Sequence, residues 1–221
     1  MTNSIILIMA TFEKGILGGF SGKVGNVVGA RWRGKNIMRS VPQRGNYTPT
    51  EKQEEQRLKF KTVIGFLNPI VDVLNLYFGK PQGDKSRSNL ATSYHLKNAV
   101  VSIPGGMEMD YAKVLISKGD LRGLDNGTLA AAAGQTLNFG WQDNSGQGKA
   151  TATDTFMVVV YEPELNLFYT NLDAATRDAT TATITLPDFM AGSEVQVWAS
   201  FNKAEANFAA ISTYMGAVTV L

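Results

Sequence analysis

The sequence predicts a mainly β protein, of the α+β class, that ends in a β-sandwich. Three observations support this prediction. Short apolar runs separated by turn residues fill the chain after Pro104, which is typical of a sandwich. A helical pattern precedes them, over residues 48–78. A glycine-rich basic segment with two weakly alternating apolar runs comes first.

We therefore expect three parts in the chain. A Gly-rich basic hairpin arm occupies residues 1–47, a helical segment residues 48–104, and the β-sandwich domain residues 105–221. A chain of 221 residues can form one large domain or two small ones. Its content of 44% apolar and 10% aromatic residues is enough for a real core.

The sequence of the arm predicts a β-hairpin. Residues 15–44 hold seven glycines, six basic residues and no acidic residue, which is too much glycine for a stable helix interior. VVGARW and IMRSVP are expected to be two strands around the turn RGKN. Gly34 is the turn residue, and Pro42 ends the second strand.

The helical segment opens on TPTE, where Thr48 is the expected N-cap and Glu51 closes a capping box. A second short helix is expected at PIVDVLNLYF, ended by Gly79. NLATSYHLKNAV forms either a third short helix or a loop packed on the core. The apolar spacing of the first helix predicts a buried stripe of Phe60, Val63, Ile64 and Leu67.

Seven strands are predicted after Pro104. They are YAKVLIS (111–117), TLNFGW (136–141), TFMVVVY (155–161), LFYT (167–170), ATITL (182–186), EVQVWAS (194–200) and TYMGAVTVL (213–221). Seven short strands in roughly 110 residues are typical of a sandwich.

This block resembles a fibronectin type III or immunoglobulin-like sandwich. Trp141 lies in the second predicted strand, where the fibronectin type III pattern has its core tryptophan. The run LPDFMAGSEVQVWASF resembles that fold's approach to its sixth strand. The sequence departs from the pattern at Trp198, because the pattern places its aromatic residue early in that strand and Trp198 comes late.

A second resemblance covers residues 9–221. MATFEKGILGGFSGKVGNVVG, RWRGKNIMRSVP, TEKQEEQRLKF, DYAKVLISKGDL and WQDNSG occur in this order before the sandwich. They resemble a Bacteroidota family catalogued as domain of unknown function 6266. The resemblance implies a bacterial or phage origin. It implies no activity and no functional residue.

The formal net charge of +2 hides an asymmetry. Residues 1–100 have a net charge of +9, and residues 101–221 have a net charge of −7. A basic front and an acidic back fit a polyanionic partner, or head-to-tail contact between copies of the chain. They fit equally well with pairing inside one compact body, so three interpretations stay open.

The sequence lacks the motifs of several classes of enzyme. The chain has no cysteine, which excludes thiolate metal sites and disulfides. A P-loop reading of the glycine-rich arm fails at Leu17 and Val24. The single histidine, His95, is near no nucleophile motif and is expected to be structural. DNSGQGKATATD matches a calcium loop weakly, so we expect a turn there. We expect no enzyme, no catalytic, metal or cofactor-binding residue, no cofactor and no small-molecule substrate.

The leading hypothesis is therefore a non-enzymatic structural protein. It would self-associate, or decorate a larger particle such as a virion or an extracellular fibre, through its basic arm. The alternative is a nucleic-acid-binding protein that uses the same arm. The expected contact residues are Lys23, Arg31, Trp32, Arg33, Lys35 and Arg39, with Arg31, Arg33 and Lys35 on one face of the hairpin and Trp32 on the other.

The sequence contains no apolar run near the ~18 residues of a membrane span. The apolar run that ends at Ala10 lacks a basic region before it, so it is a poor signal peptide. We expect no membrane contact, and a cytoplasmic or virion location rather than general secretion. Met1 and Met9 are both candidate starts.

Overall fold

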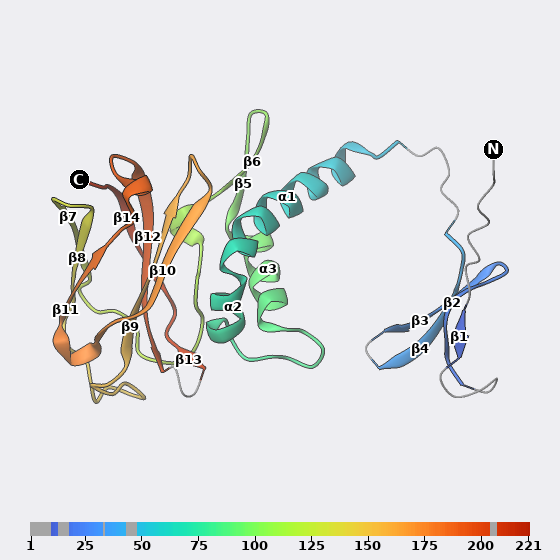
Figure 1. The fold of residues 1–221 in the computed structure, drawn as a ribbon, viewed down its shortest axis with the longest axis horizontal. Helices are drawn as coiled ribbons and strands as arrows, with labels where there is room; N and C mark the ends of the chain where they lie inside the picture. Colours follow the sequence, from blue (N-terminus) through green and yellow to red (C-terminus); the bar gives the residue numbers. More distant parts are fainter. Residues whose placement is uncertain (1–9, 13–17, 33, 43–47, 204–206) are drawn as a thin grey trace. The chain divides into compact units, whose positions relative to one another are not determined.

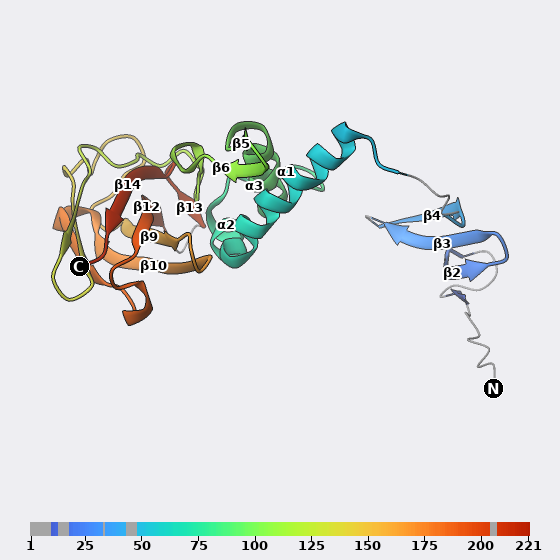
Figure 2. The ribbon, with the colours of Figure 1, turned by 90° about the horizontal axis from the view of Figure 1, so that it is seen from above.

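The protein is described by a computed structural model that covers residues 10–12, 18–32, 34–42, 48–203 and 207–221 (Figures 1 and 2). The chain forms two compact units, Met1–Thr50 and Glu51–Leu221. Each unit is described by itself below.

The first unit contains a four-stranded antiparallel sheet in the order β1-β2-β3-β4. Its strands are β1 (Thr11–Phe12), β2 (Phe20–Val24), β3 (Val27–Trp32) and β4 (Lys35–Ser40). The predicted hairpin is β3–β4. Strand β2 was not predicted, because Gly22 interrupts the side-chain alternation of FSGKV.

Gly29 allows β2 and β3 to lie close together. A Cβ atom on Gly29 would lie 2.4 Å from the carbonyl oxygen of Phe20 and 2.5 Å from carbons of its ring. Contacts this short are not tolerated, so only glycine fits at this position. The phenyl ring of Phe20 thus occupies the space above Gly29.

The second unit begins with three helices (Figure 1). They are α1 (Glu51–Leu67), α2 (Val71–Tyr77), joined to α1 by a 3-10 turn at Asn68–Ile70, and α3 (Arg87–Asn98). The segment NLATSYHLKNAV is therefore largely helical. Ser86 caps α3, since its hydroxyl oxygen accepts a hydrogen bond of 3.2 Å from the N–H of Asn89.

The predicted stripe on α1 is wrong at Phe60, whose side chain is 52% exposed. The prediction is confirmed at Val63 and Leu67, which are buried together with Phe66, and Ile64 is half-buried. Phe60 lies one turn before these residues, in a part of α1 where residues 51–58 are all exposed. The apolar spacing was read correctly as helical, but the core begins one turn later.

Two sheets form a fibronectin type III-like sandwich. One sheet has the order β11-β8-β7, and the other the order β10-β9-β12-β14, with β13 paired to the end of β12. Counted along the chain, β10 is the fourth strand of the sandwich, and it pairs with the third strand, β9, and not with the fifth strand, β11. In immunoglobulin constant domains the fourth strand pairs with the fifth instead. The strands are β7 (Thr128–Ala132), β8 (Thr136–Gly140), β9 (Thr155–Glu162), β10 (Leu167–Thr176), β11 (Thr181–Thr185), β12 (Glu194–Lys203), β13 (Phe208–Ala209) and β14 (Thr213–Thr219).

Six of the seven predicted strands are present, and the one predicted at 111–117 is wrong. That segment contains a 3-10 helix, Tyr111–Lys113, followed by a stretch without a strand ladder. The first strand of the sandwich is β7, whose sequence TLAAA has few of the β-branched and aromatic residues that mark strands. A hairpin of β5 (Val100–Ile103) and β6 (Gly106–Met109) was also not predicted.

The sheet β10-β9-β12-β14 is covered on both faces. One face packs on β7, β8 and β11 around Leu137, Phe156 and Val197. The other packs on the helices, where Phe66 and Trp198 belong to the same buried cluster. Burial on both faces explains why TFMVVVY is continuously apolar. The predicted boundary between residues 104 and 105 therefore divides what the structure joins as one unit.

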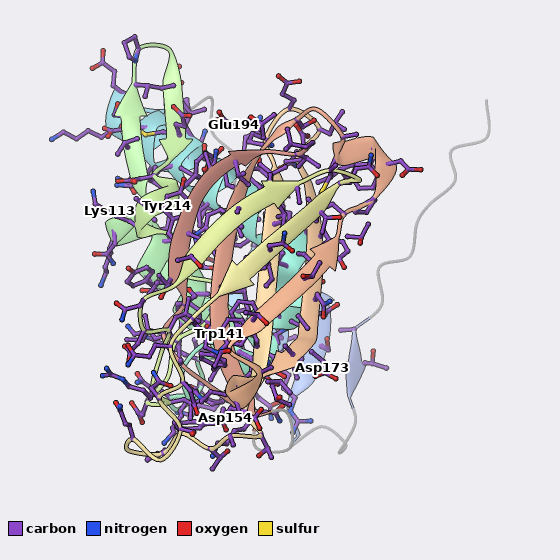
Figure 3. The ribbon with its side chains drawn as sticks, turned by 90° about the vertical axis from the view of Figure 1, so that its left-hand side faces the viewer. Lys113, Trp141, Asp154, Asp173, Glu194 and Tyr214 are labelled. Carbon is purple, nitrogen blue, oxygen red and sulfur yellow. The ribbon has the colours of Figure 1, made fainter. Side chains whose placement is uncertain are left out.

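Asp154 lies at one end of the sandwich (Figure 3). There it forms a buried ion pair with Arg177. Both side chains are fully buried, and the Arg177 Nε donates a 3.0 Å hydrogen bond to the carboxylate. The guanidinium also donates to the Asn144 side chain and to the carbonyl oxygen of Arg122, and it lies 3.8 Å from the centre of the Phe201 ring. Burial lowers the pKa of Arg177, and the charge of Asp154 opposes that effect.

We predict that Arg177→Met lowers the free energy of unfolding by about 3 kcal/mol, because it leaves the buried Asp154 with only the partly exposed Lys203, 3.4 Å away, as a cationic partner. Denaturant titration measures this change. The matched control is Arg122→Met, which removes an ion pair with Asp125 whose side chains are 50% and 30% exposed. That change should cost no more than about 1 kcal/mol. Equal losses in the two variants would contradict the prediction.

Candidate functional site

The register of the first sheet gathers basic residues on one of its faces. Residues paired across antiparallel strands point to the same side. Lys23 pairs with Val28, and Val28 with Arg39. Trp32 pairs with Lys35 across the turn. We call this surface the basic face, and it consists of Lys23, Val28, Ala30, Trp32, Lys35, Ile37 and Arg39.

The predicted ladder of basic residues is wrong. Arg31 pairs with Asn36, which places it on the face opposite Lys35. Trp32 shares the face of Lys35 and not the face of Arg31. The cause is the two-residue turn, because it reverses the chain between positions 32 and 35 and aligns their side chains. Arg33 lies outside the described residues.

Four of the six expected contact residues thus lie on the basic face. They are Lys23, Trp32, Lys35 and Arg39, and all four are exposed. Sequence reasoning missed Val28 and Ile37 as members of the same surface. The correct register of β3 and β4 would have predicted them, because Val28 pairs with Arg39, and Ile37 lies two residues from both Lys35 and Arg39 on β4.

The basic face has no acidic residue among the strands that form it. The sequences FSGKV, VVGARW and KNIMRS contain no Asp or Glu. Trp32 is 56% exposed and Ile37 39% exposed, so apolar surface lies between the cations. Such a surface can contact an acidic protein surface or a polyanion.

Among the strands that the structure describes, β4 pairs with β3 alone, so it leaves an edge of this sheet open. All six of its residues are exposed. Across the 17 residues of β2, β3 and β4, the burial patterns show Gly29 as the single buried residue. Strands β2, β3 and β4 therefore supply no fully buried apolar side chain to hold the sheet.

A family model, described as a family of unknown function (DUF6266), matches residues 19–216. The chain belongs to this family. The match spans β2 to β4 and nearly all of the second unit, so both units are part of the DUF6266 sequence pattern.

Other comparisons give no activity for the DUF6266 chain. No curated protein matches it. Among solved structures, the chain is similar to the fibronectin type III domain of human collagen alpha-1(XX) chain, with 18% sequence identity and a TM-score of 0.28. That similarity covers 47% of this chain and 84% of the collagen domain.

His95 of the DUF6266 chain is a fully buried residue of α3. Its Nδ1 lies 2.7 Å from the carbonyl oxygen of Ala91, and its Nε2 accepts a 3.2 Å hydrogen bond from the N–H of Leu115. These two bonds assign the neutral tautomer with the proton on Nδ1. Burial lowers the pKa of His95. Both ring nitrogens are engaged by the backbone, which fits the expected structural role.

The weak calcium-loop match is built as a set of turns. Asp143 accepts hydrogen bonds from the N–H and hydroxyl of Ser145. Asp154 is held by Arg177 and Thr151. Among the described residues, no cluster of three or more His, Cys, Asp or Glu could hold a metal ion. The carboxylates of this segment thus serve turn structure and the buried ion pair.

In the part of the chain that the structure describes, no helix has the length and apolar character needed to span a bilayer.

We predict that His95 makes the DUF6266 protein less stable in mild acid. Its pKa is lowered in the folded state, so the unfolded chain takes up the proton first as pH falls through about 6.5. The free energy of unfolding should then fall by up to about 1.4 kcal/mol per pH unit below that value. Denaturant titrations between about pH 7.5 and 5.5 measure this slope.

The control is His95→Gln, which removes the titrating group and should give a flatter profile over the same range. Since the chain has one histidine, its proton resonances report this titration directly. A folded-state pKa at or above about 6.5 would contradict the prediction.

Proposed function

We propose that this protein is a non-enzymatic assembly protein that docks its N-terminal sheet on another subunit. The sheet would join copies of the chain to one another, or attach the chain to a larger particle such as a virion or an extracellular fibre. The observation that carries the proposal is the burial pattern of β2, β3 and β4, where Gly29 alone is buried.

A sheet of this kind gains little stability from its own side chains. Small sheets need an apolar face packed on a helix, a second sheet or a partner. Val28, Trp32 and Ile37 provide apolar surface on the basic face, and docking would remove it from water. Burial against another subunit therefore supplies the missing stabilisation.

The open edge of β4 supports the same proposal. An unpaired edge presents backbone N–H and C=O groups that can pair with a strand from another chain. The acidic counterpart is available in a second copy, because residues 101–221 have a net charge of −7. Head-to-tail contacts of this type build rings or filaments. A bacterial or phage origin, which the family resemblance implies, is compatible with a virion or fibre context.

We predict that the full-length chain associates in a concentration-dependent way, seen by light scattering coupled to gel filtration. Lys23→Glu/Lys35→Glu/Arg39→Glu should shift the protein toward monomer, because it reverses three charges of the basic face. The matched control, Lys52→Glu/Arg57→Glu/Lys61→Glu, reverses three exposed charges on α1 and should leave association unchanged. A chain that stays monomeric at high concentration would contradict self-association.

The alternative function is nucleic-acid binding, and one observation favours it. Trp32 lies on the same face as Lys23, Lys35 and Arg39. An exposed aromatic ring among cations is the arrangement that stacks a base while neighbouring cations contact phosphates.

If this alternative holds, single-stranded DNA or RNA should bind with an affinity that falls steeply with salt. Fluorescence anisotropy at several salt concentrations gives the slope, which is about −0.7 per phosphate neutralised. Lys23→Glu/Lys35→Glu/Arg39→Glu should make that slope shallower. Trp32→Ala should cost about 1–3 kcal/mol without changing the slope. An affinity that does not change with salt concentration, or that is the same in both variants as in the unaltered protein, would contradict this function.

A further inference from the structure

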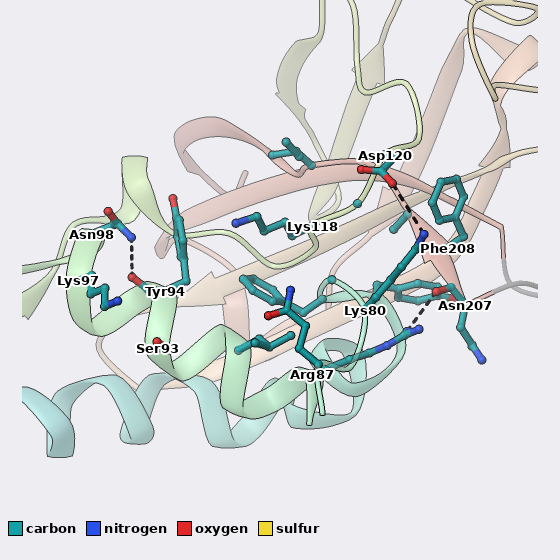
Figure 4. A pocket seen from close by; sticks show the side chains of 18 residues that line it. Lys80, Arg87, Ser93, Tyr94, Lys97, Asn98, Lys118, Asp120, Asn207 and Phe208 are labelled. Carbon is teal, nitrogen blue, oxygen red and sulfur yellow. Dashed lines mark hydrogen bonds and ion pairs between the residues drawn. The ribbon is translucent and has the colours of Figure 1, made fainter. Parts of the chain in front are cut away.

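A cavity of about 620 Å³ lies within the second unit, between α2, α3, the segment around Lys118 and β13 (Figure 4). Its volume falls in the range of small-molecule pockets. The cavity is separate from the basic face, which belongs to the first unit. An inference about it is therefore independent of the proposed function.

Aromatic and aliphatic side chains form part of the cavity wall. Phe78 and Tyr77 of the α2 end are buried, and Leu90 and Tyr94 line it from α3. Phe208 of β13 lines it from the sandwich. Leu90, Tyr94 and Lys97 share one face of α3 because they are spaced by four and three residues. An aromatic ring of a ligand could thus contact apolar side chains from the helices and from the sandwich.

Four cationic side chains line the cavity against one carboxylate. They are Lys80, Arg87, Lys97 and Lys118, and the carboxylate belongs to Asp120. At one end, Lys80 lies 3.9 Å from Asp120, and Arg87 donates a 3.1 Å hydrogen bond to the carbonyl oxygen of Asn207. These two cations already have partners inside the protein.

The other end of the cavity holds two cations without a carboxylate partner. Figure 4 shows Lys97 and Lys118 on the side of Tyr94, away from Asp120. Among the described residues, no carboxylate oxygen lies within 4.0 Å of either ammonium group. The Nζ of Lys118 lies 5.2 Å from the centre of the Tyr94 ring, which orients it over an aromatic surface.

We propose that this cavity binds a small organic anion that carries an apolar ring. The anionic group would lie between Lys97 and Lys118, and the ring would pack on Tyr94 and Leu90. Two cations without a carboxylate partner attract an anion and favour its bound state, while the apolar side chains of the cavity favour burial of the ring. A neutral molecule of the same shape would gain the apolar contacts alone.

The test uses 8-anilino-1-naphthalenesulfonate as the probe, with the full-length protein. Its neutral counterpart, N-phenyl-1-naphthylamine, has the same rings without the sulfonate. Fluorescence titration should show saturable binding of the sulfonate at one site per chain. Lys97→Glu/Lys118→Glu should weaken that binding by about tenfold or more, which is about 1.4 kcal/mol. Binding of the neutral probe should change little.

Two controls keep the result interpretable. Lys52→Glu/Lys61→Glu reverses two exposed charges on α1, outside the cavity, and should bind the sulfonate like the unaltered protein. Lys97→Met/Lys118→Met removes the charges without reversing them and should give an intermediate loss. Circular dichroism and thermal melting check that each variant is folded.

Three results would overturn the proposal. The first is the absence of saturable sulfonate binding. The second is equal sulfonate affinity in the cavity variant and the α1 control, which would place the probe elsewhere. The third is an equal loss for both probes, which would show an apolar cavity without recognition of the anion.

Discussion

The ion pair of Arg177 and Asp154 is the constraint on which the sandwich depends most directly. Two fully buried charges are costly unless each is paired and hydrogen-bonded. The guanidinium meets this condition by joining Asp154, Asn144 and the carbonyl of Arg122, which come from three separate segments. The carbonyl of Arg177 in turn accepts a 2.8 Å hydrogen bond from the indole of Trp141. The hydrogen bonds that satisfy the buried guanidinium therefore connect these three segments to the core residue Trp141.

The sheet β10-β9-β12-β14 connects the core of the sandwich to the helices, because both of its faces are covered. Neighbouring residues of β12 point to opposite sides, so Val197 enters the core between the sheets and Trp198 the core beneath α1. The Trp198 indole donates a 3.2 Å hydrogen bond to the carbonyl of Tyr111, which fixes the segment before Lys118. His95 binds the N–H of Leu115 from the helical side. The walls of the cavity are thus positioned by the same sheet that forms the sandwich.

The sequence predicted the elements better than it predicted which residues meet. Strands such as TFMVVVY and EVQVWAS were found because β-branched and aromatic runs need burial on a pleated surface. The segment 111–117 has the same apolar character, but Val114 and Ile116 are buried outside any strand ladder, which composition cannot show. The ladder of Arg31 and Lys35 failed because the alternation was counted through a turn. The cavity could not be predicted, since only tertiary packing places Lys97 and Lys118 in the lining of one cavity.

The two units use positive charge in different physical settings. On the basic face the cations lie on an exposed sheet, where screening by salt is strong and a large contact area is needed for affinity. Lys97 and Lys118 are exposed as well, but they stand beside apolar side chains of the cavity, which a compact ligand can contact on more than one side. An extended partner therefore suits the sheet and a compact ligand suits the cavity. Because the sites need different partners, loss of one can leave the other intact.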